Sequence, residues 1–198
     1  VPAGENRHRR NFADPRVLMM AAFSNTDTKL QVISFKLRSA DGTIFDSSTL
    51  KEDLQLICFT CNHCPYALAA WPVLIDLADE YRGRVAFVAI NSNNNPDYPD
   101  DRFEEMAPFM EKMGVNMPYL FDEDQSVARS YGAVCTPEPF LFLRGQLFYH
   151  GRINDNWKEP EKVKEQSLKL ALEAALGQGS LPDSIHPSMG CSIKWVSP

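Results

Sequence analysis

The arrangement that most constrains this chain is a helical stretch held between two short, nearly continuous apolar runs. Residues 54–60 (LQLICFT) and 84–91 (RVAFVAIN) are rich in β-forming residues, as expected of parallel strands that are covered on both faces. Between them, apolar residues recur at three-to-four spacing from Leu68 to Tyr81, and the pattern ends at Gly83. Strand, helix and strand form a crossover unit, which predicts a parallel sheet.

The segments on either side extend this sheet. Residues 30–37 place Ile33, Phe35 and Leu37 on one face and are followed by Asp41-Gly42, which predicts an edge strand with a hairpin. The further predicted elements are a helix that begins with a capping box of Asp101 and Glu104 and ends before Gly114, a helix over 124–131, a hairpin of 138–143 and 146–150, and a last helix over 161–176. The order predicts an α/β fold with a central mixed sheet flanked by helices, and inserted helices between a βαβ half and a ββα half.

Composition and charge narrow the function classes. The 198 residues are 44% apolar with a net charge of −6, which is typical of a globular domain and gives no basic stripe for nucleic acid. The longest run without a charged or strongly polar residue, 66–75, contains Pro72 and is shorter than the roughly 18 residues of a membrane-spanning helix. We therefore expect neither a nucleic-acid partner nor an integral membrane protein.

The sequence suggests one domain with two appended segments. Residues 1–29 are predicted as an N-terminal extension, 30–177 as the domain and 178–198 as a C-terminal tail that carries Cys191. A basic start followed by the apolar residues 17–23 faintly resembles the end of a targeting segment, but a flexible extension is favoured. The sequence does not determine the compartment: the cytoplasm is slightly favoured, and export or an organelle are the alternatives.

Five cysteines are too few for a disulfide scaffold, and three of them lie within seven residues. Cys61-Asn62-His63-Cys64 falls where a predicted strand meets a predicted helix, and Pro65 is tolerated in the first turn. The N-terminus of a helix favours a thiolate, the reactive form of cysteine. Two cysteines at this spacing can also close a disulfide. A C-x-x-C pair at such a junction favours redox chemistry over zinc, since a second ligand pair does not follow at the usual spacing.

Two further features surround this pair. An imidazolium at His63 would stabilise the Cys61 thiolate and make the disulfide more oxidising; the alternative is an exposed residue without effect. Cys135-Thr136-Pro137 opens a predicted strand, and Pro137 is a candidate for a cis bond. If Pro137 packs against the cysteines, the Thr136 backbone can pair in β fashion with an extended substrate.

Together, the motifs FTCNHCPY, VCTPEPFLF, GRIND and GCSIKW resemble the thioredoxin superfamily, and within it the redoxin branch of peroxiredoxins and thiol reductases. The resemblance covers residues 30–177. It implies a thioredoxin-like fold, Cys61 as an exposed nucleophile, Cys64 as a buried resolving thiol and Pro137 as the cis-proline.

Three departures accompany the resemblance. The tryptophan-glycine-proline surroundings of thioredoxin are missing, and its buried carboxylate has only Asp53 as a candidate. Of the peroxiredoxin pattern, Cys64-Pro65 is kept, but Cys61 stands at the threonine position and Ile57 at the proline position. If peroxidase activity exists, the resemblance makes Cys64 the attacking thiol, with Arg152 as a charge partner.

The other cysteines have several interpretations. Cys135 is a bystander, a third ligand or an internal resolving thiol, and Cys58 is an inert core residue. Cys191 lies in a tail rich in proline and serine, which either brings its thiol over the site or to a partner, or forms a buried cap through Ile193 and Trp195.

Three functions follow from these observations. The first is a thiol-disulfide oxidoreductase, in which Cys61 attacks a disulfide of a protein or small thiol and Cys64 resolves it, without a cofactor beyond the redox-active pair. An external reductant, such as a thioredoxin or glutathione system, would recycle it. The second is a thiol peroxidase, and the third is a copper or zinc carrier that uses Cys61, His63 and Cys64 with Cys135.

Overall fold

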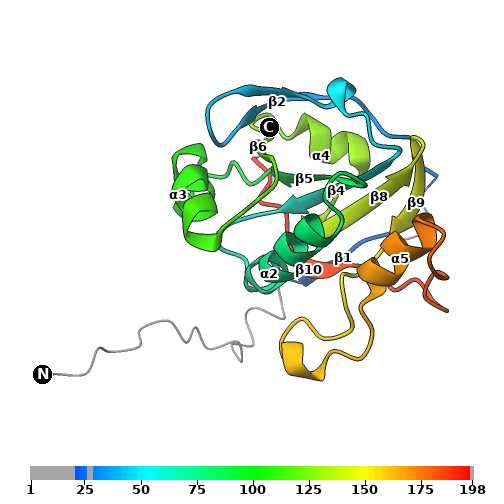
Figure 1. Cartoon of the computed structure of the whole chain (residues 1–198). Helices are drawn as coiled ribbons and strands as arrows, with labels where there is room; N and C mark the ends of the chain where they lie inside the picture. The colour runs from blue at the N-terminus through cyan, green and yellow to red at the C-terminus, as the bar shows by residue number, and fades with distance from the viewer. Residues whose placement is uncertain (1–20, 26–28, 197–198) are drawn as a thin grey trace, which may run out of the picture.

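The computed structural model describes residues 21–25 and 29–196, and its centre is a mixed seven-stranded sheet (Figure 1). The strands run in the order β3-β2-β6-β5-β4-β8-β9. Their bounds are β2 Lys36–Ser39, β3 Ile44–Asp46, β4 Leu54–Thr60, β5 Ala86–Asn91, β6 Tyr119–Phe121, β8 Glu138–Leu143 and β9 Gln146–His150. β4, β5 and β6 are parallel neighbours, while β8 and β9 continue the sheet as an antiparallel hairpin. The predicted crossover unit and the mixed sheet are confirmed.

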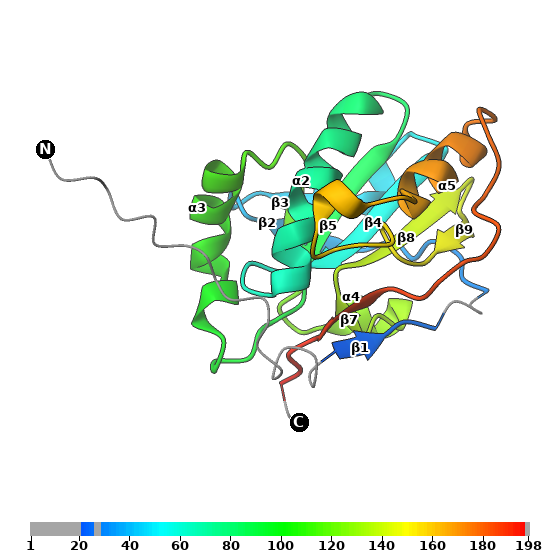
Figure 2. The ribbon, with the colours of Figure 1, turned by 90° about the horizontal axis from the view of Figure 1, so that it is seen from below.

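Helices cover both faces of this sheet. α2 (Pro65–Glu80), α3 (Phe103–Met113) and α5 (Ser167–Ala175) pack on one face, and α4 (Ser126–Tyr131) packs on the other. Figure 2 shows the first three helices together, with α4 apart from them near β7. Three short 3-10 helices complete the list: η1 Ser47–Thr49, η2 Pro99–Asp101 and η3 Pro160–Lys162. Each helical layer buries its own apolar cluster against the sheet, so the fold is a three-layer α/β sandwich.

A second, smaller sheet brings together one strand from the N-terminal segment, one from the C-terminal segment and one that precedes β8. It consists of β1 (Ala21–Phe23), β10 (Met189–Ser192) and β7 (Cys135–Thr136), all antiparallel, with β10 in the centre. In Figure 2, β1 and the red C-terminal segment lie beside β7, below the N-terminal end of α2. Within the described residues, the predicted extension and tail therefore each supply a strand. Residues 1–20, which contain most of the segment compared with a targeting sequence, lie outside the described residues.

Three predicted boundaries are wrong. The strand over 30–37 begins only at Lys36, because residues 30–32 bond instead to Gly145 and Leu147 at the start of β9. Its apolar alternation is nevertheless right, since Ile33, Phe35 and Leu37 all join the cluster under α4.

The last helix starts at Ser167, not at residue 161. The preceding residues bond to the loop that follows β9: Asp155 N–H donates to Glu165 O at 3.1 Å, and Lys164 N–H donates to the Asp155 carboxylate at 3.0 Å.

The third wrong boundary is the cap of α3. Its N-cap is Arg102, without a side-chain cap bond, because the Asp101 carboxylate turns inward.

Among the described helices, none is both long and apolar enough to cross a membrane.

Candidate active site

The two cysteines of the CNHC segment lie where β4 ends and α2 begins. Cys64 is the N-cap residue of α2, and Pro65 is its first helical residue. The Leu68 N–H donates to the Cys64 carbonyl at 2.8 Å, which closes the first turn. A side chain at this position faces unpaired backbone N–H groups and the positive end of the helix dipole, and both favour an anion. The helix therefore acts on Cys64 more directly than on Cys61.

The Cys64 sulfur is completely buried and lies among hydrogen-bonding groups. As a thiol it donates to the Thr136 carbonyl at 3.3 Å. Burial by itself raises its pKa, but hydrogen bonds from the thiols of Cys191 and Cys61 and from the Ala67 N–H outweigh this effect. The net result is a Cys64 pKa below that of an ordinary thiol.

Cys61 is also completely buried, so the expectation of an exposed nucleophile at this position is wrong. Its sulfur lies 3.3 Å from Thr136 Oγ1, and its carbonyl accepts a hydrogen bond from Trp71 Nε1 at 3.1 Å. Burial, the neighbouring Cys64 thiol and the carboxylate of Asp101 raise the pKa of Cys61 well above the ordinary value. The thiolate character predicted for Cys61 therefore belongs to Cys64.

Thr136 is the residue that contacts both sulfur atoms, through its hydroxyl and its carbonyl. The peptide bond from Thr136 to Pro137 is cis. The loop is held from behind by the buried carboxylate of Glu138, which accepts hydrogen bonds from the N–H groups of Val134 and Cys135 at 2.7 and 2.9 Å. The other carboxylate oxygen lies 2.8 Å from His150 Nε2. Glu138 and His150 are both buried, so this hydrogen-bonded pair fixes the loop from inside the fold.

His63 hydrogen-bonds Asp101, and one of its ring nitrogens lies within 4.8 Å of the Cys61 sulfur. Its Nδ1 lies 2.5 Å from Oδ2 of Asp101, whose carboxylate is completely buried. The same carboxylate accepts hydrogen bonds from the Asn62 N–H at 2.8 Å and from Asn93 Nδ2 at 2.7 Å. The His63 ring is therefore held by Asp101, and its predicted effect on the Cys61 thiolate stays a prediction.

In the part of the chain that the structure describes, Cys61, His63 and Asp101 also bring three potential metal-ligand atoms within 4.8 Å of one another. This set differs from the predicted one, in which Cys64 and Cys135 complete the ligands. Cys64 instead donates to the Thr136 carbonyl at 3.3 Å, while the Cys135 sulfur lies 4.0 Å from the carbonyls of Pro137 and Ser188.

The other predicted residues take the following places. Burial raises the pKa of both Cys58 and Cys135 far above the ordinary value, in keeping with inert thiols. The Arg152 guanidinium is bonded to Glu165 at 2.9 Å and to Ser167 at 3.1 Å. Cys191 lies in β10, directly opposite Thr136.

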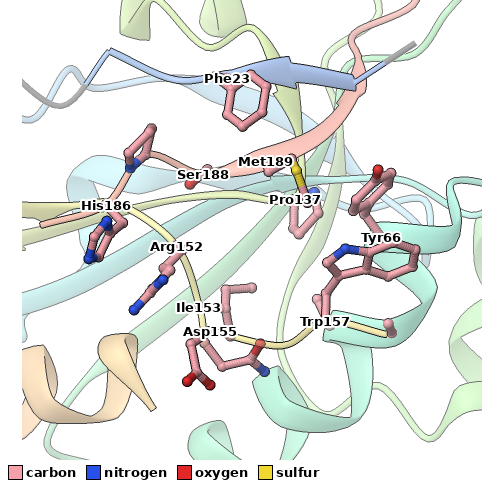
Figure 3. Close-up of a pocket in the computed structure, with 14 residues that line it drawn as sticks. Phe23, Tyr66, Pro137, Arg152, Ile153, Asp155, Trp157, His186, Ser188 and Met189 are labelled. Atoms are coloured by element: carbon pink, nitrogen blue, oxygen red, sulfur yellow. The ribbon is translucent and has the colours of Figure 1, made fainter. Parts of the chain in front are cut away.

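A cavity of about 330 Å³ opens beside this centre (Figure 3). Its wall includes Pro137 and Met189. The rings of Tyr66 and Trp157, whose centroids are 4.0 Å apart and whose planes are tilted by 38°, close one side. Phe23 covers another side, as Figure 3 shows. The wall is largely apolar and leads to the cis-proline, so an apolar or aromatic group fits here.

Sequence analysis missed Glu138 and misplaced Asp101. Glu138 stands in the apolar run EPFLFL, and an acidic residue in a strand predicted to be buried was the available signal. Asp53, the carboxylate candidate taken from thioredoxin, is exposed and pairs with Arg144 at 3.2 Å. Glu138 and Asp101 are the completely buried carboxylates near the cysteines.

The comparisons with known proteins agree with this geometry. The model of the AhpC/TSA family matches residues 29–150. A crystal structure of an uncharacterized conserved protein from Geobacillus kaustophilus is 38% identical with a TM-score of 0.83, and the alignment covers 90% of this chain and 97% of that one. A hypothetical protein from Sinorhizobium meliloti is 34% identical with a TM-score of 0.81, covering 89% and 99%.

More distant structures share the fold. A protein from Chlorobium tepidum, described as a putative thiol:disulfide interchange protein DsbE, has a TM-score of 0.60 at 19% identity and covers 77% of this chain and 100% of its own. This likeness identifies a thioredoxin-like fold. Among curated proteins, none matches the chain.

Proposed function

The chain belongs to the AhpC/TSA family of thioredoxin-like proteins, and from this premise we propose that it is a thiol-disulfide oxidoreductase whose attacking thiol is Cys64. The observation that carries the proposal is the position of the Cys64 sulfur. It lies at the N-terminus of α2, receives hydrogen bonds from its surroundings, and has the Cys61 thiol as a neighbour. A stabilised thiolate next to a second thiol is the minimum requirement for dithiol-disulfide exchange.

The reaction proceeds in two exchanges. The Cys64 thiolate attacks one sulfur of a substrate disulfide, forms a mixed disulfide and releases the first substrate thiol. Cys61 then gives up its proton and attacks the Cys64 sulfur, which forms the Cys61–Cys64 disulfide and releases the second thiol. The substrate gains two electrons and two protons, and an external dithiol returns the pair to its reduced form.

The surrounding residues support each thiol in its role. The raised pKa of Cys61 keeps it protonated until the mixed disulfide forms. Its carbonyl is anchored by Trp71, and the next residue, Asn62, is held by Asp101 through its N–H and by the Tyr119 hydroxyl at 2.8 Å through its side chain. These contacts restrain the loop between the two sulfurs, which favours the geometry in which the Cys61 sulfur attacks the Cys64 sulfur.

The cavity points to the chemistry of the substrate. A group that reaches Pro137 through it passes the rings of Tyr66 and Trp157. We therefore favour a disulfide that carries apolar or aromatic groups, in a small molecule or in a flexible peptide segment.

Turnover of the small disulfide hydroxyethyl disulfide, with glutathione as reductant, tests the proposal. The wild-type protein is expected to accelerate the reduction, Cys64→Ser is expected to abolish the effect, and Cys61→Ser is expected to slow turnover because the Cys61–Cys64 disulfide cannot form. Cys58→Ser is the matched control, because Cys58 is equally buried but belongs to the core under the helices. A wild-type rate equal to the uncatalysed rate, or a Cys64→Ser variant as active as the wild type, would overturn the assignment.

A thiol peroxidase is the second candidate. It is favoured by family membership and by Cys64-Pro65, since the thiol of lowered pKa is the one followed by proline. In that reaction the Cys64 thiolate attacks the peroxide, becomes a sulfenic acid and releases an alcohol or water. Peroxide consumption that survives Cys61→Ser, is abolished by Cys64→Ser, and exceeds disulfide turnover would favour this candidate.

A metal carrier is supported less well by the geometry. In the only ligand grouping found among the described residues, Asp101 Oδ2 is already engaged by His63 and Asn93, and the Cys61 thiol resists deprotonation. The metal carrier would become the favoured function if protein purified without chelator held about one equivalent of metal and the Cys61→Ser variant held none.

A further inference from the structure

The edge of β7 at which an extended substrate was predicted to bind is occupied by the chain itself. β10 pairs antiparallel with β7, and the register sets Cys191 opposite Thr136 and Ser192 opposite Cys135. Thr136 is the residue that contacts both active-site sulfurs. A cysteine of the C-terminal segment therefore lies where the cysteine of a β-paired substrate would lie.

The backbone around Gly190 is built for this close approach. A Cβ atom at position 190 would lie 2.1 Å from the Thr136 carbonyl oxygen and 2.6 Å from the Thr136 carbonyl carbon, distances that no side chain tolerates. The missing side chain lets β10 rest directly on the Thr136–Pro137 peptide. The position before Cys191 thus requires glycine for a steric reason, and this fixes the distance of Cys191 from the site.

Strand pairing and hydrogen bonds hold β10 in position along its length. On its outer edge it pairs with β1, where Ala21 lies opposite Cys191. Before it, Ser188 N–H donates to Ser24 Oγ and Ser188 Oγ donates to the Gly151 carbonyl, both at 2.8 Å. After it, Ile193 N–H donates to the Val134 carbonyl at 3.0 Å, and the Ile193 side chain is buried. Cys191 is thus held in place as firmly as a core residue.

The Cys191 side chain turns toward the reactive sulfur. It belongs to the same buried cluster as Cys61 and Cys64 and keeps 7% of its surface exposed, and the neighbouring Cys64 thiol together with burial raises the pKa of Cys191 above the ordinary value. Cys135, one residue from the register partner of Cys191, lies instead against carbonyl groups. Cys64 thus has two neighbouring thiols, one from its own loop and one from the far end of the chain.

We propose that Cys191 is a third redox thiol, which resolves the mixed disulfide on Cys64 by forming a Cys64–Cys191 disulfide. The proposal rests on the function proposed above and deepens it: Cys191 takes over the release of the second substrate thiol, and Cys61 acts one step later. The Cys64 thiolate attacks a disulfide and releases one thiol. Cys191 then loses its proton and attacks the Cys64 sulfur, and the second substrate thiol leaves. Cys61 next attacks Cys64, which moves the disulfide to Cys61–Cys64 and restores the Cys191 thiol.

This arrangement also selects substrates. Because β10 fills the β7 edge, a protein segment cannot pair with Thr136 while β10 is in place. A disulfide that enters through the cavity beside Tyr66 and Met189 needs no such pairing. Small disulfides are therefore the substrate class that fits the closed site.

The test uses Cys61→Ser, which leaves Cys64 and Cys191 as the two thiols of the centre, and dithiobis(nitrobenzoate) as the disulfide. If Cys191 resolves the mixed disulfide between Cys64 and the reagent, each reagent molecule releases two thionitrobenzoate ions in the fast phase. No adduct then remains on the protein. The double variant Cys61→Ser/Cys191→Ser should release one and keep the adduct, and Cys61→Ser/Cys64→Ser should lose the fast phase.

Peptide mapping identifies the bond independently and does not depend on the folding of a Cys191 variant. Trypsin separates the cysteines into the peptides 52–82, 130–144 and 170–194. Oxidised Cys61→Ser is expected to show 52–82 joined to 170–194. A stable adduct on Cys64 in this variant, or a link to 130–144 instead, overturns the role of Cys191 while disulfide turnover by the wild type still supports the proposed function. A Cys64 that does not react with the reagent overturns both.

Discussion

The Oδ2 atom of Asp101 lies 2.5 Å from Nδ1 of His63, and this contact ties the CNHC loop to the segment between β5 and α3. The carboxylate is completely buried and also accepts hydrogen bonds from Asn62 and Asn93. Its charge is one reason why the pKa of Cys61 is raised, after burial and the Cys64 thiol. Asp101 is therefore a positioning residue with an electrostatic effect on the redox pair.

Replacing Asp101 by Asn should make the Cys61–Cys64 disulfide more oxidising. Without the negative charge of Asp101, the free energy needed to form the Cys61 thiolate is lower, so the reduced state of the pair is stabilised. The expected rise in reduction potential is on the order of 30 mV, which corresponds to about a tenfold change in the exchange equilibrium. Equilibration with glutathione measures it, and Asp100→Asn, which changes an exposed neighbour, is the control. An unchanged or lower potential for Asp101→Asn would contradict this electrostatic role.

The lowered pKa of Cys64 predicts a distinctive pH profile. In Cys61→Ser, alkylation of Cys64 by iodoacetamide should already be near its maximal rate at neutral pH, and should fall only in the acid range, below the value of about 8.5 of a free thiol. Serine keeps a hydroxyl donor in place of the Cys61 thiol. A half-maximal rate at or above pH 8 would show that burial outweighs the hydrogen bonds.

The same shift predicts how stability depends on pH. A depressed pKa in the folded state contributes stability that is fully present above the pKa of the unfolded thiol and is lost as the pH falls toward the folded value. The difference in unfolding free energy between wild type and Cys64→Ser should therefore shift in favour of the wild type from acid pH toward pH 9. Urea unfolding at several pH values measures this, and a difference independent of pH would contradict it.

The hydrogen-bonded pair behind the cis-proline loop should be needed for stability. Glu138→Ala leaves the N–H groups of Val134 and Cys135 and the buried His150 without their partner. Breaking a buried pair in this way costs about 3–5 kcal/mol. Urea unfolding should show such a loss for Glu138→Ala, and a change within about 0.5 kcal/mol for Glu123→Ala, an exposed residue. Equal effects of the two substitutions would refute the structural role of the pair.

The parts of the site that sequence analysis predicted depend on short-range patterns. The junction of β4 and α2, and Thr136-Pro137 at the start of β8, follow from periodicity and from residue types within about ten positions. Asp101 and Cys191 reach the cysteines through contacts between distant segments. The Asp101 carboxylate meets the Asn62 N–H 39 positions away, and β10 finds β7 across more than fifty residues. No local pattern states which edge the segment MGCS will pair with.

The assignment of the two thiols shows the same limit. Spacing gives two cysteines at the start of a helix but does not say which one is the N-cap. That is decided by where the first turn closes, and here Pro65 places Cys64 at the cap. The resemblance to thioredoxin therefore led to the first cysteine, whereas the helix geometry favours the second.

Gly190→Ala gives a final prediction, which tests whether β10 delivers Cys191 to Cys64. The added methyl group would lie 2.1 Å from the Thr136 carbonyl oxygen, a backbone atom that cannot move aside. β10 must therefore shift away from β7, at a cost of about 1–3 kcal/mol. In the Cys61→Ser background, the link between peptides 52–82 and 170–194 should form at least tenfold more slowly, and bulky maleimides should label Cys64 faster.

Gly179→Ala is the matched control for this experiment. A Cβ at position 179 meets Glu173 Cβ at an ordinary contact distance of 3.7 Å, and the change lies in the same C-terminal segment, before β10. It should leave both the linking rate and the labelling rate unchanged. If Gly190→Ala instead links Cys64 to Cys191 as fast as this control, the close packing of β10 on the Thr136–Pro137 peptide is not what places Cys191. The two sulfurs would then meet through motion of the C-terminal segment, and glycine at position 190 would serve only the stability of the small sheet.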